Sequence, residues 1–245
     1  MTARIKKSVA EQLRPFWIII AVCAAAAAVA GYYAITWRGF HARNITVGGM
    51  QVVSRRDVLI RAAIDPQKNL WLQNTHAAEL RIESIPYVKS ASLHRSLPAD
   101  LRIDLTERTP SAVIVVGERA VLIDPDGRVL ETDGLYPSAL PRMRIAVNEP
   151  LVAGRFLKDA RVARAQRDYN QLLRHGVVTT ALEFDKLMEL TVRLGSGVRV
   201  RLGADNDLAE KAALVEPILQ QIAGKIDKVV SLDLRAPQTP VVVYK

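Results

Sequence analysis

An uncharged stretch near the N-terminus constrains the fold of this chain more than any other feature. Residues 15–37, PFWIIIAVCAAAAAVAGYYAITW, contain no charged side chain, and a helix of about 20 apolar residues crosses the hydrocarbon layer of a membrane. Aromatic residues stand at both ends of the stretch, as in the interfacial belts of membrane helices. They are Phe16 and Trp17 at one end, and Tyr32, Tyr33 and Trp37 at the other. The sequence therefore predicts a transmembrane helix over residues 15–37.

A cleaved signal peptide is the competing interpretation of this stretch, because residues 28–30, Ala-Val-Ala, resemble a cleavage site. The apolar run continues to Trp37, beyond the core of a typical signal peptide, which favours an uncleaved anchor. Two roles stay open for the anchor: a simple tether, or a helix that also pairs with others through the small side chains of residues 24–28.

The charges that flank the anchor predict its orientation. The tail 1–14 contains four basic residues and one acidic residue, and short basic segments are retained on the cytoplasmic side. We therefore expect a cytoplasmic tail over residues 1–14 and the bulk of the chain on the outer side of the cytoplasmic membrane.

The composition argues against most chemical functions. Cys23 is the sole cysteine and the four histidines are scattered, so neither a disulfide within the chain nor a cysteine-based metal site is expected. No metalloprotease, serine-hydrolase or phosphate-loop motif is present. The net charge is +9, but the sequence contains no basic helix interleaved with aromatic residues of the kind that binds nucleic acids. This favours a solvated basic surface. We expect no catalytic residue, no cofactor, no metal, no nucleic acid and no small-molecule substrate.

Residues 38–109 predict a small domain of three strands and two helices. A short strand at 45–49 is followed by a capping box at Ser54 that opens a helix to about Ala63, and by a second helix over 75–84. Residues 88–108 form an alternating hairpin, with Leu101, Ile103 and Leu105 on its buried face. The predicted order is strand, helix, helix, strand, strand. In the helices we expect the apolar contacts from Val58, Leu59 and Ile60, and from Leu80 with the alanines at 77 and 78.

Residues 110–245 predict a mainly antiparallel β domain with two helices. Apolar runs at 112–116, 120–123 and 129–131 read as strands, and the D-x-D-G of residues 124–127 reads as a hairpin turn rather than the start of a calcium loop. Helices are expected over 161–175 and from Leu208 to about Ile222, the second with Asp207 and Glu210 as a capping box.

The stretch MELTVRLGSGVRVRL, residues 188–202, has the clearest pattern in the chain. Apolar residues alternate on both sides of a Gly-Ser-Gly turn, which predicts a hairpin with one buried face. The other face carries Glu189, Arg193, Arg199 and Arg201. Two interpretations of this charged row stay open: a solvated sheet face, or a contact surface for acidic partners.

An ordered set of short motifs resembles the POTRA domain of the FtsQ (DivIB) family of bacterial division proteins. The motifs are Val47-x-Gly49, Val53-Ser54, Asp57-Val58, Asn69-Leu70-Trp71, Ile85-Pro86-Tyr87-Val88-Lys89-x-Ala91, Arg95-x-x-Pro98, Leu101-x-Ile103 and Glu107-Arg108-x-Pro110-x-Ala112. Met50 and Tyr87 depart from the family pattern, which has a polar residue and a tryptophan there. The anchor, the domain order and the length also fit this resemblance, so it covers nearly the whole chain.

The resemblance implies an α+β protein of the cell division machinery. It implies a single-pass type II protein of the cell inner membrane, at the division septum, that links early and late division proteins. FtsB and FtsL are the implied partners, with FtsK, FtsW and FtsI as further ones. Proteins of this family receive FtsB on their last strand.

The last residues of the chain predict the corresponding site. Residues 230–235 alternate as a half-buried strand, and Pro237 and Pro240 precede a β-rich run that ends near Lys245. This run is either simply the last strand of the sheet or an edge that a partner strand extends. In the second case the predicted partner-binding residues are Arg235, Val241, Val242, Val243 and Tyr244. This chain has Ala236 where family members can carry an aromatic residue after the arginine.

Three functions compete for this chain: a non-enzymatic scaffold, a POTRA module for chaperone or transport work in the envelope, and a cell-wall enzyme. Transport modules precede barrels of roughly ten-residue alternating strands, whereas two helices are predicted after residue 160. If the chain is an enzyme, Glu107 is the candidate catalytic acid. Because it stands beside Arg108, we instead expect it to be an ion-paired residue at the end of a strand. We therefore expect the scaffold.

Overall fold

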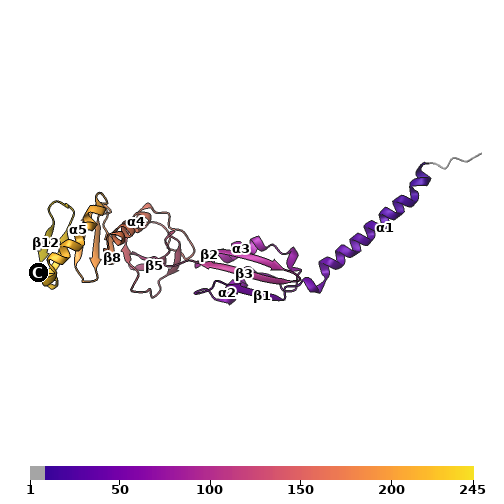
Figure 1. The fold of residues 1–245 in the computed structure, drawn as a ribbon, viewed down its shortest axis with the longest axis horizontal. Helices are drawn as coiled ribbons and strands as arrows, with labels where there is room; N and C mark the ends of the chain where they lie inside the picture. The colour runs from indigo at the N-terminus through magenta and orange to yellow at the C-terminus, as the bar shows by residue number, and fades with distance from the viewer. Residues whose placement is uncertain (1–8) are drawn as a thin grey trace, which may run out of the picture. The chain divides into compact units, whose positions relative to one another are not determined.

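The computed structural model describes residues 9–245 (Figure 1). The basic residues at positions 4, 6 and 7, on which the expected orientation depends, lie outside the described residues. Residues 9–14 of the predicted tail belong to the first helix, α1 (Val9–Thr36).

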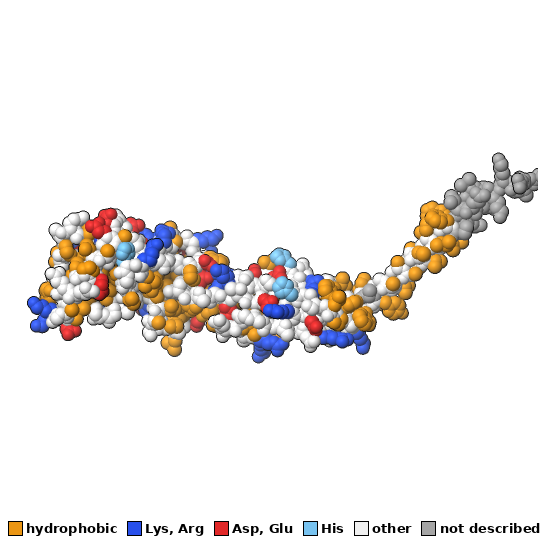
Figure 2. Space-filling model, in the orientation of Figure 1, with side chains coloured by type: hydrophobic (Ala, Val, Ile, Leu, Met, Phe, Trp, Pro, Cys, Tyr) orange, Lys and Arg blue, Asp and Glu red, His pale blue; other side chains and the backbone are white. Residues whose placement is uncertain are grey.

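Helix α1 has the length and composition of a membrane-spanning helix. Its window Phe16–Tyr33 has a mean hydropathy of 2.0, and none of that window is buried against the rest of the protein. Hydrophobic side chains follow one another along this helix in Figure 2. A short 3-10 turn, η1 (Arg38–Phe40), comes after it. The helix agrees with the predicted anchor, because an apolar helix without a protein partner needs an apolar solvent.

The first small sheet has the predicted element order. The elements are β1 (Asn44–Gly48), α2 (Arg55–Ala62), the 3-10 turn η2 (Leu70–Leu72), α3 (Thr75–Glu83), β2 (Val88–Ser96) and β3 (Asp100–Glu107). The sheet order is β1-β3-β2, with β1 parallel to β3 and Val47 opposite Ile103. Leu101, Ile103 and Leu105 are all buried. The order strand, helix, helix, strand, strand is confirmed, and so is the buried face of the hairpin.

The predicted apolar contacts of the two helices were partly wrong. Ile60 is 63% exposed and Leu80 is 55% exposed. The buried positions are Val58 and Ala62 in α2, and Ala78 and Ile82 in α3. In each helix these two positions are four residues apart, so they lie on one face. The cap at Ser54 is confirmed, because its hydroxyl accepts the Asp57 N–H at 3.1 Å.

The C-terminal part forms one sheet of nine strands that carries two helices. Its strands are β4 (Ala112–Val116), β5 (Arg119–Ile123), β6 (Val129–Thr132), β7 (Arg142–Arg144), β8 (Thr179–Phe184), β9 (Leu190–Leu194), β10 (Arg199–Gly203), β11 (Val229–Asp233) and β12 (Val241–Tyr244). The helices are α4 (Ala160–Arg174) and α5 (Leu208–Gln221), followed by the 3-10 helix η3 (Ala223–Lys228). The strand order is β12-β11-β10-β9-β8-β7-β4-β5-β6.

One row of residues across this sheet shows where the core lies. The register aligns Met143, Leu182, Val192, Val200, Leu232 and Val242 on successive strands. The first five are fully buried and share one cluster with the buried side chains of α4 and α5. Both helices therefore cover the same face of the sheet. The predicted hairpin of residues 188–202 is confirmed as β9 and β10, with its arginines on the opposite face.

Two predicted details at turns had different outcomes. The Gly127 N–H donates to the carbonyl of Asp124 at 3.0 Å between the antiparallel strands β5 and β6, which confirms the hairpin turn. The capping box of α5 was wrong: Asp207 has a φ of 56° and makes no side-chain cap bond. Its backbone carbonyl instead accepts the Lys211 N–H at 3.0 Å.

The described chain divides into two compact units that interleave in sequence. The second unit contains Gln51–Val53, Glu83–Ser90 and Thr106–Lys245, and the first contains the other residues. The second unit thus includes three short segments from before residue 110. The domain boundary at residue 109 stays a prediction.

Glu107 connects two of these segments inside the second unit. Its carboxylate accepts the N–H groups of Gln51, Val52 and Val53, each at 2.9 Å. Burial on its own would raise the pKa of Glu107, but the three N–H donors outweigh it, so the pKa lies below the usual value of a glutamate. The expected ion pair between Glu107 and Arg108 was wrong, because Arg108 pairs with Asp124 and Asp126.

The lowered pKa predicts a pH-dependent contribution of Glu107 to stability. Its stabilisation is present above the unfolded pKa of about 4.3 and is lost as the pH falls through the lower folded value. Glu107→Gln should lower the free energy of unfolding by about 1 kcal/mol at pH 7, after allowance for solvent screening. The difference between the variant and the wild type should vanish at low pH. Thermal unfolding and amide exchange of Gln51–Val53, measured at both pH values, check this.

Glu118→Gln is the matched control, because Glu118 is exposed and has no hydrogen bond or ion pair within the described chain. It should leave both measurements unchanged. If Glu118→Gln and Glu107→Gln behave alike, the three amide contacts do not stabilise the fold.

Candidate partner-binding edge

Strand β12 is the edge of the nine-stranded sheet. It pairs antiparallel with β11, with Ser231 opposite Val243, Leu232 opposite Val242 and Asp233 opposite Val241. No other strand of the described chain pairs with its outer side. The position predicted for residues 241–244, an edge rather than an interior strand, is confirmed.

The outer side of β12 presents backbone groups for pairing. The Lys245 N–H donates to the carbonyl of Lys228 at 2.8 Å, on the β11 side. Backbone groups alternate between the two sides of a strand, so Val243 and Val241 also point toward β11. Val242 and Tyr244 then point their N–H and C=O groups away from the sheet. An added strand would find both a donor and an acceptor at each of these two residues.

The side chains of β12 divide between the two faces of the sheet. Val242 is half-buried and packs against the main core, whereas Val241 is 54% exposed and Val243 is 44% exposed. Tyr244 is 46% exposed. The strand is therefore held by one apolar contact and by its ladder with β11, while most of its side-chain surface is open to a partner.

Arg235 lies just beyond β11 and is held by a neighbouring carboxylate. Its Nε lies 3.0 Å from Oδ1 of Asp233, and its Nη2 lies 2.8 Å from Oδ2 of the same residue. The hydrogen bonds from Arg235 are the main reason that the pKa of Asp233 is lowered. Arg201 adds a longer ion pair of 3.6 Å to Asp233. The guanidinium of Arg235 therefore has a fixed position, although almost half of its side chain is exposed.

Sequence reasoning missed the residues that position Arg235. Gly203 lies under the arginine, since a Cβ at this glycine would come within 2.9 Å of the Arg235 Cγ. Asp233 was expected only as a polar position of the strand. The Asp-x-Arg spacing of residues 233 and 235 is a signal for this pairing, because residues i and i+2 share one face of an extended chain.

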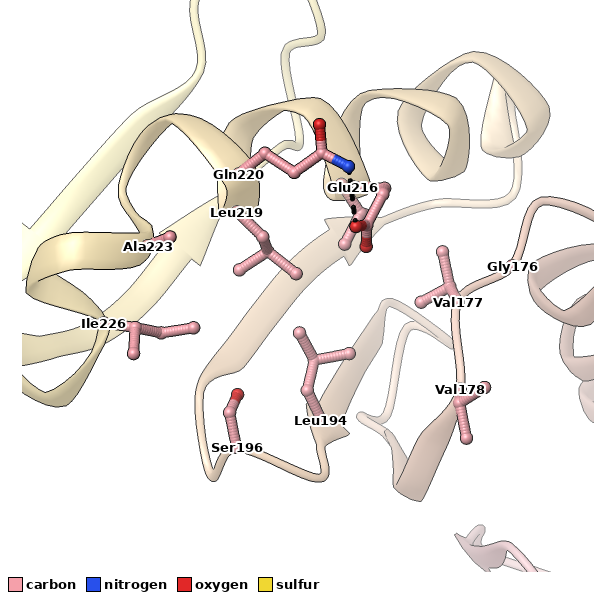
Figure 3. A pocket seen from close by; sticks show the side chains of 11 residues that line it. Gly176, Val177, Val178, Leu194, Ser196, Glu216, Leu219, Gln220, Ala223 and Ile226 are labelled. Atoms are coloured by element: carbon pink, nitrogen blue, oxygen red, sulfur yellow. Dashed lines mark hydrogen bonds between the residues drawn. The ribbon is translucent and has the colours of Figure 1, made fainter.

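An apolar groove of about 380 Å³ lies at the end of the sheet where β12 ends. Figure 3 shows Val177, Leu194 and Leu219 around it, with Glu216 and Gln220 at its rim. The Gln220 side chain donates to Oε1 of Glu216 at 3.0 Å. With this lining the groove fits an aliphatic side chain. Neither the groove nor the edge contains a nucleophile beside a base, or a pair of carboxylates arranged for acid–base chemistry.

Within the described residues, no group of three or more His, Cys, Asp or Glu side chains is close enough to hold a metal ion. The fold and the edge thus define a class of protein: one helix able to cross a membrane, a small αβ sheet unit, and a larger sheet that ends in an open edge strand. An unpaired edge of this kind has the backbone groups that β-strand addition requires.

Comparison with known families identifies the particular group. A model described as "POTRA domain, FtsQ-type" matches residues 40–108, and one described as "Cell division protein FtsQ/DivIB, C-terminal" matches residues 112–235. The chain belongs to the FtsQ/DivIB family of cell division proteins, as the sequence motifs indicated.

Several curated relatives align with most of the chain. The cell division protein FtsQ of Myxococcus fulvus is 28% identical over 213 residues, which cover 83% of this chain and 73% of the relative. That of Streptomyces venezuelae is 27% identical, with 85% of this chain and 75% of the relative covered. That of Mycolicibacterium smegmatis is 29% identical, with 82% of this chain but 56% of the relative covered.

Proposed function

We propose that this protein is a non-enzymatic, membrane-anchored scaffold of the cell division machinery that binds FtsB, and with it FtsL, through strand β12. Membership in the FtsQ/DivIB family supports the role in cell division. The proposed binding site rests on one observation, the unpaired outer side of β12 within the described chain, because a partner segment can add itself there as a further strand.

The proposed complex combines backbone pairing with side-chain contacts. The outward groups of Val242 and Tyr244 pair with the partner strand, and the exposed faces of Val241 and Val243 contact its apolar side chains. Arg235, held in place by Asp233, offers its exposed guanidinium to a partner carboxylate. In this arrangement Arg235 adds selectivity to a contact whose affinity comes mainly from the strand.

We further propose that α1 crosses the cytoplasmic membrane with the N-terminus in the cytoplasm, and that the protein acts at the septum. The helix supports the membrane location, because its apolar window has no partner within the described chain. The outer part then lies in the periplasm, where FtsK, FtsW and FtsI are further candidate partners.

Photo-crosslinking in dividing cells tests the proposed edge. A photoreactive amino acid at Val241 or Val243 should give a crosslink to FtsB, because both side chains are exposed on β12. Leu187 is the control position, since it is 81% exposed but belongs to the turn before β9. Crosslinks to FtsB from position 187 and none from 241 or 243 would contradict the proposal.

A further inference from the structure

The face of the large sheet opposite α4 and α5 carries two aligned rows of side chains. The first row runs through Arg142, Ala181, Arg193, Arg199, Ser231 and Val243. The second runs through Arg144, Glu183, Thr191, Arg201, Asp233 and Val241. Paired residues on neighbouring strands point to the same face of a sheet. We call Arg142, Arg144, Arg193, Arg199 and Arg201 the arginine face.

Three of the five side chains of the arginine face have no ion pair within the described residues. Glu183 lies 3.8 Å from Arg193, and Asp233 lies 3.6 Å from Arg201. Asp233 is also the partner of Arg235. The side chains of the other three arginines, at positions 142, 144 and 199, are exposed and make no ion pair or hydrogen bond within the described residues. The arginine face therefore has free guanidinium groups on at least two strands.

This arrangement is unfavourable for the sheet itself. Arg193 and Arg199 lie directly opposite each other on β9 and β10, and like charges in such a pair destabilise a sheet. A solvated sheet face has no need for two arginines at opposed positions. An acidic group bound between them would compensate this local cost.

The open area has a defined limit. On β4, β5 and β6 the same face is covered, because Val113, Leu122 and Leu130 pack beneath Tyr136 and Leu140. From β7 to β11 it carries two hollows of about 340 and 320 Å³, both lined by Arg201, Glu183 and Thr191. The first is also lined by Arg144 and Arg235 and by two carboxylates, Asp185 and Glu189. The arginine face spans four strands, β7 to β10, which at a spacing of about 4.8 Å give a width of about 14 Å. An extended segment of about five residues spans that width.

We propose that the arginine face binds an acidic segment of a protein partner, which crosses strands β7 to β10. This site goes beyond the edge strand, because its charged side chains lie on different strands from the backbone groups of β12. Carboxylates at alternate positions of an extended segment are about 6.6 Å apart, which lies between the spacing of neighbouring strands, about 4.8 Å, and that of next-nearest strands, about 9.6 Å. The long arginine side chains can bridge this difference. Arginine binds carboxylates through paired N–H donors.

The chemistry of the face favours a protein segment over a nucleic acid. Single-stranded nucleic acids bind to aromatic stacking platforms, and neither row contains an aromatic residue. Glu183 and Asp233 interrupt the second row with carboxylates, which repel a continuous phosphate backbone. Both can accept hydrogen bonds from the N–H groups of a peptide.

The test measures binding of a rhodamine-labelled peptide of about eight alternating Glu and Ala residues by fluorescence anisotropy. The full chain is held in nanodiscs of zwitterionic lipid, so that no anionic headgroup competes. Arg193→Gln with Arg199→Gln should weaken peptide binding roughly tenfold, the effect of two exposed charge contacts. The melting temperature of this double variant should stay the same or rise, because the opposed like charges are gone.

The control is Arg167→Gln with Arg174→Gln, which removes the same charge from exposed positions of α4. It should change the affinity less than twofold. The charge-reversed pair, Arg193→Glu with Arg199→Glu, should gain binding of a Lys-Ala peptide. Equal losses of peptide affinity in the two double Gln variants would refute the proposed site, because net charge alone would then explain binding. The proposed partner class would be wrong if an oligonucleotide binds the wild type more tightly than the peptide does and also loses more affinity in the Arg193→Gln with Arg199→Gln variant.

Discussion

Deletion of residues 241–245 is expected to abolish co-purification of FtsB with this protein. The deletion removes all of β12, and with it the outward backbone groups of Val242 and Tyr244 on which the proposed pairing depends. Membrane insertion and the first unit should be unaffected, because β12 belongs to the second unit and, among the strands of the described chain, pairs with β11 alone. The measurement is recovery of FtsB on tagged full-length protein and on the deletion variant, with membrane extraction as the insertion assay.

The deletion also exposes β11 and removes the packing of Val242, so a second comparison must separate binding from folding. Tyr244→Pro removes one outward N–H while leaving the inward groups of β12 in place. Tyr244→Ala removes the aromatic ring but keeps that N–H. We expect Pro to weaken FtsB binding at least tenfold, the effect of a lost hydrogen bond at a desolvated edge, and Ala to weaken it less.

Arg235→Glu should weaken binding less completely than the deletion. It reverses the charge offered to the partner and places a carboxylate beside Asp233, but it leaves the strand intact. Undiminished recovery of FtsB with the deletion variant would refute the edge-strand proposal. Loss of binding with Tyr244→Ala equal to that with Tyr244→Pro would assign the contact to the ring instead.

Asp124→Ala is expected to be the most destabilising single substitution in the second unit. Asp124 is 1% exposed, forms a buried ion pair with Arg108, and accepts the Arg128 N–H at 2.8 Å. Loss of one partner leaves the other charge buried, which costs about 3–5 kcal/mol. Phe156 cannot compensate, although its ring lies 5.3 Å from the Arg108 guanidinium. The melting temperature of this unit should fall by roughly 6–20 °C.

Asp126→Ala provides a matched comparison in the same turn. Asp126 also pairs with Arg108, at 3.0 Å, but its side chain is 52% exposed. Exposed ion pairs contribute about 1 kcal/mol or less, so this variant should melt within a few degrees of the wild type. Circular dichroism of the detergent-solubilised chain measures both. Equal melting temperatures for the two variants would show that the buried pair does not hold this turn.

The sequence alone predicted the elements that depend on local patterns. An uncharged run of membrane length predicts α1 without reference to any other residue. The period of two in residues 188–202 predicts both the hairpin and its arginine-bearing face, because alternate side chains of a strand point to opposite faces. The ordered motifs of residues 47–112 predicted the family. Likewise, the prolines before residue 241 predicted an edge position for the last strand.

Residues with several possible partners could not be assigned in the same way. Glu107 and Arg108 are adjacent in sequence, yet Glu107 binds the amides of Gln51–Val53 and Arg108 binds Asp124. Leu80 is apolar, as most core residues are, but it lies on the exposed side of α3. Short helices of eight or nine residues give too few turns to define their buried face.

The tertiary structure decided everything that depends on which strands become neighbours. Local alternation determines the face of the sheet to which the side chains of Arg193 and Arg142 point. Only the register across β7, β8 and β9 brings these two side chains into one row. In the same way, the carboxylate that holds Arg235 became evident from side-chain geometry, although the two residues are close in sequence. Pairing between strands far apart in the chain depends on the burial of the whole sheet beneath α4 and α5, and no local pattern encodes it.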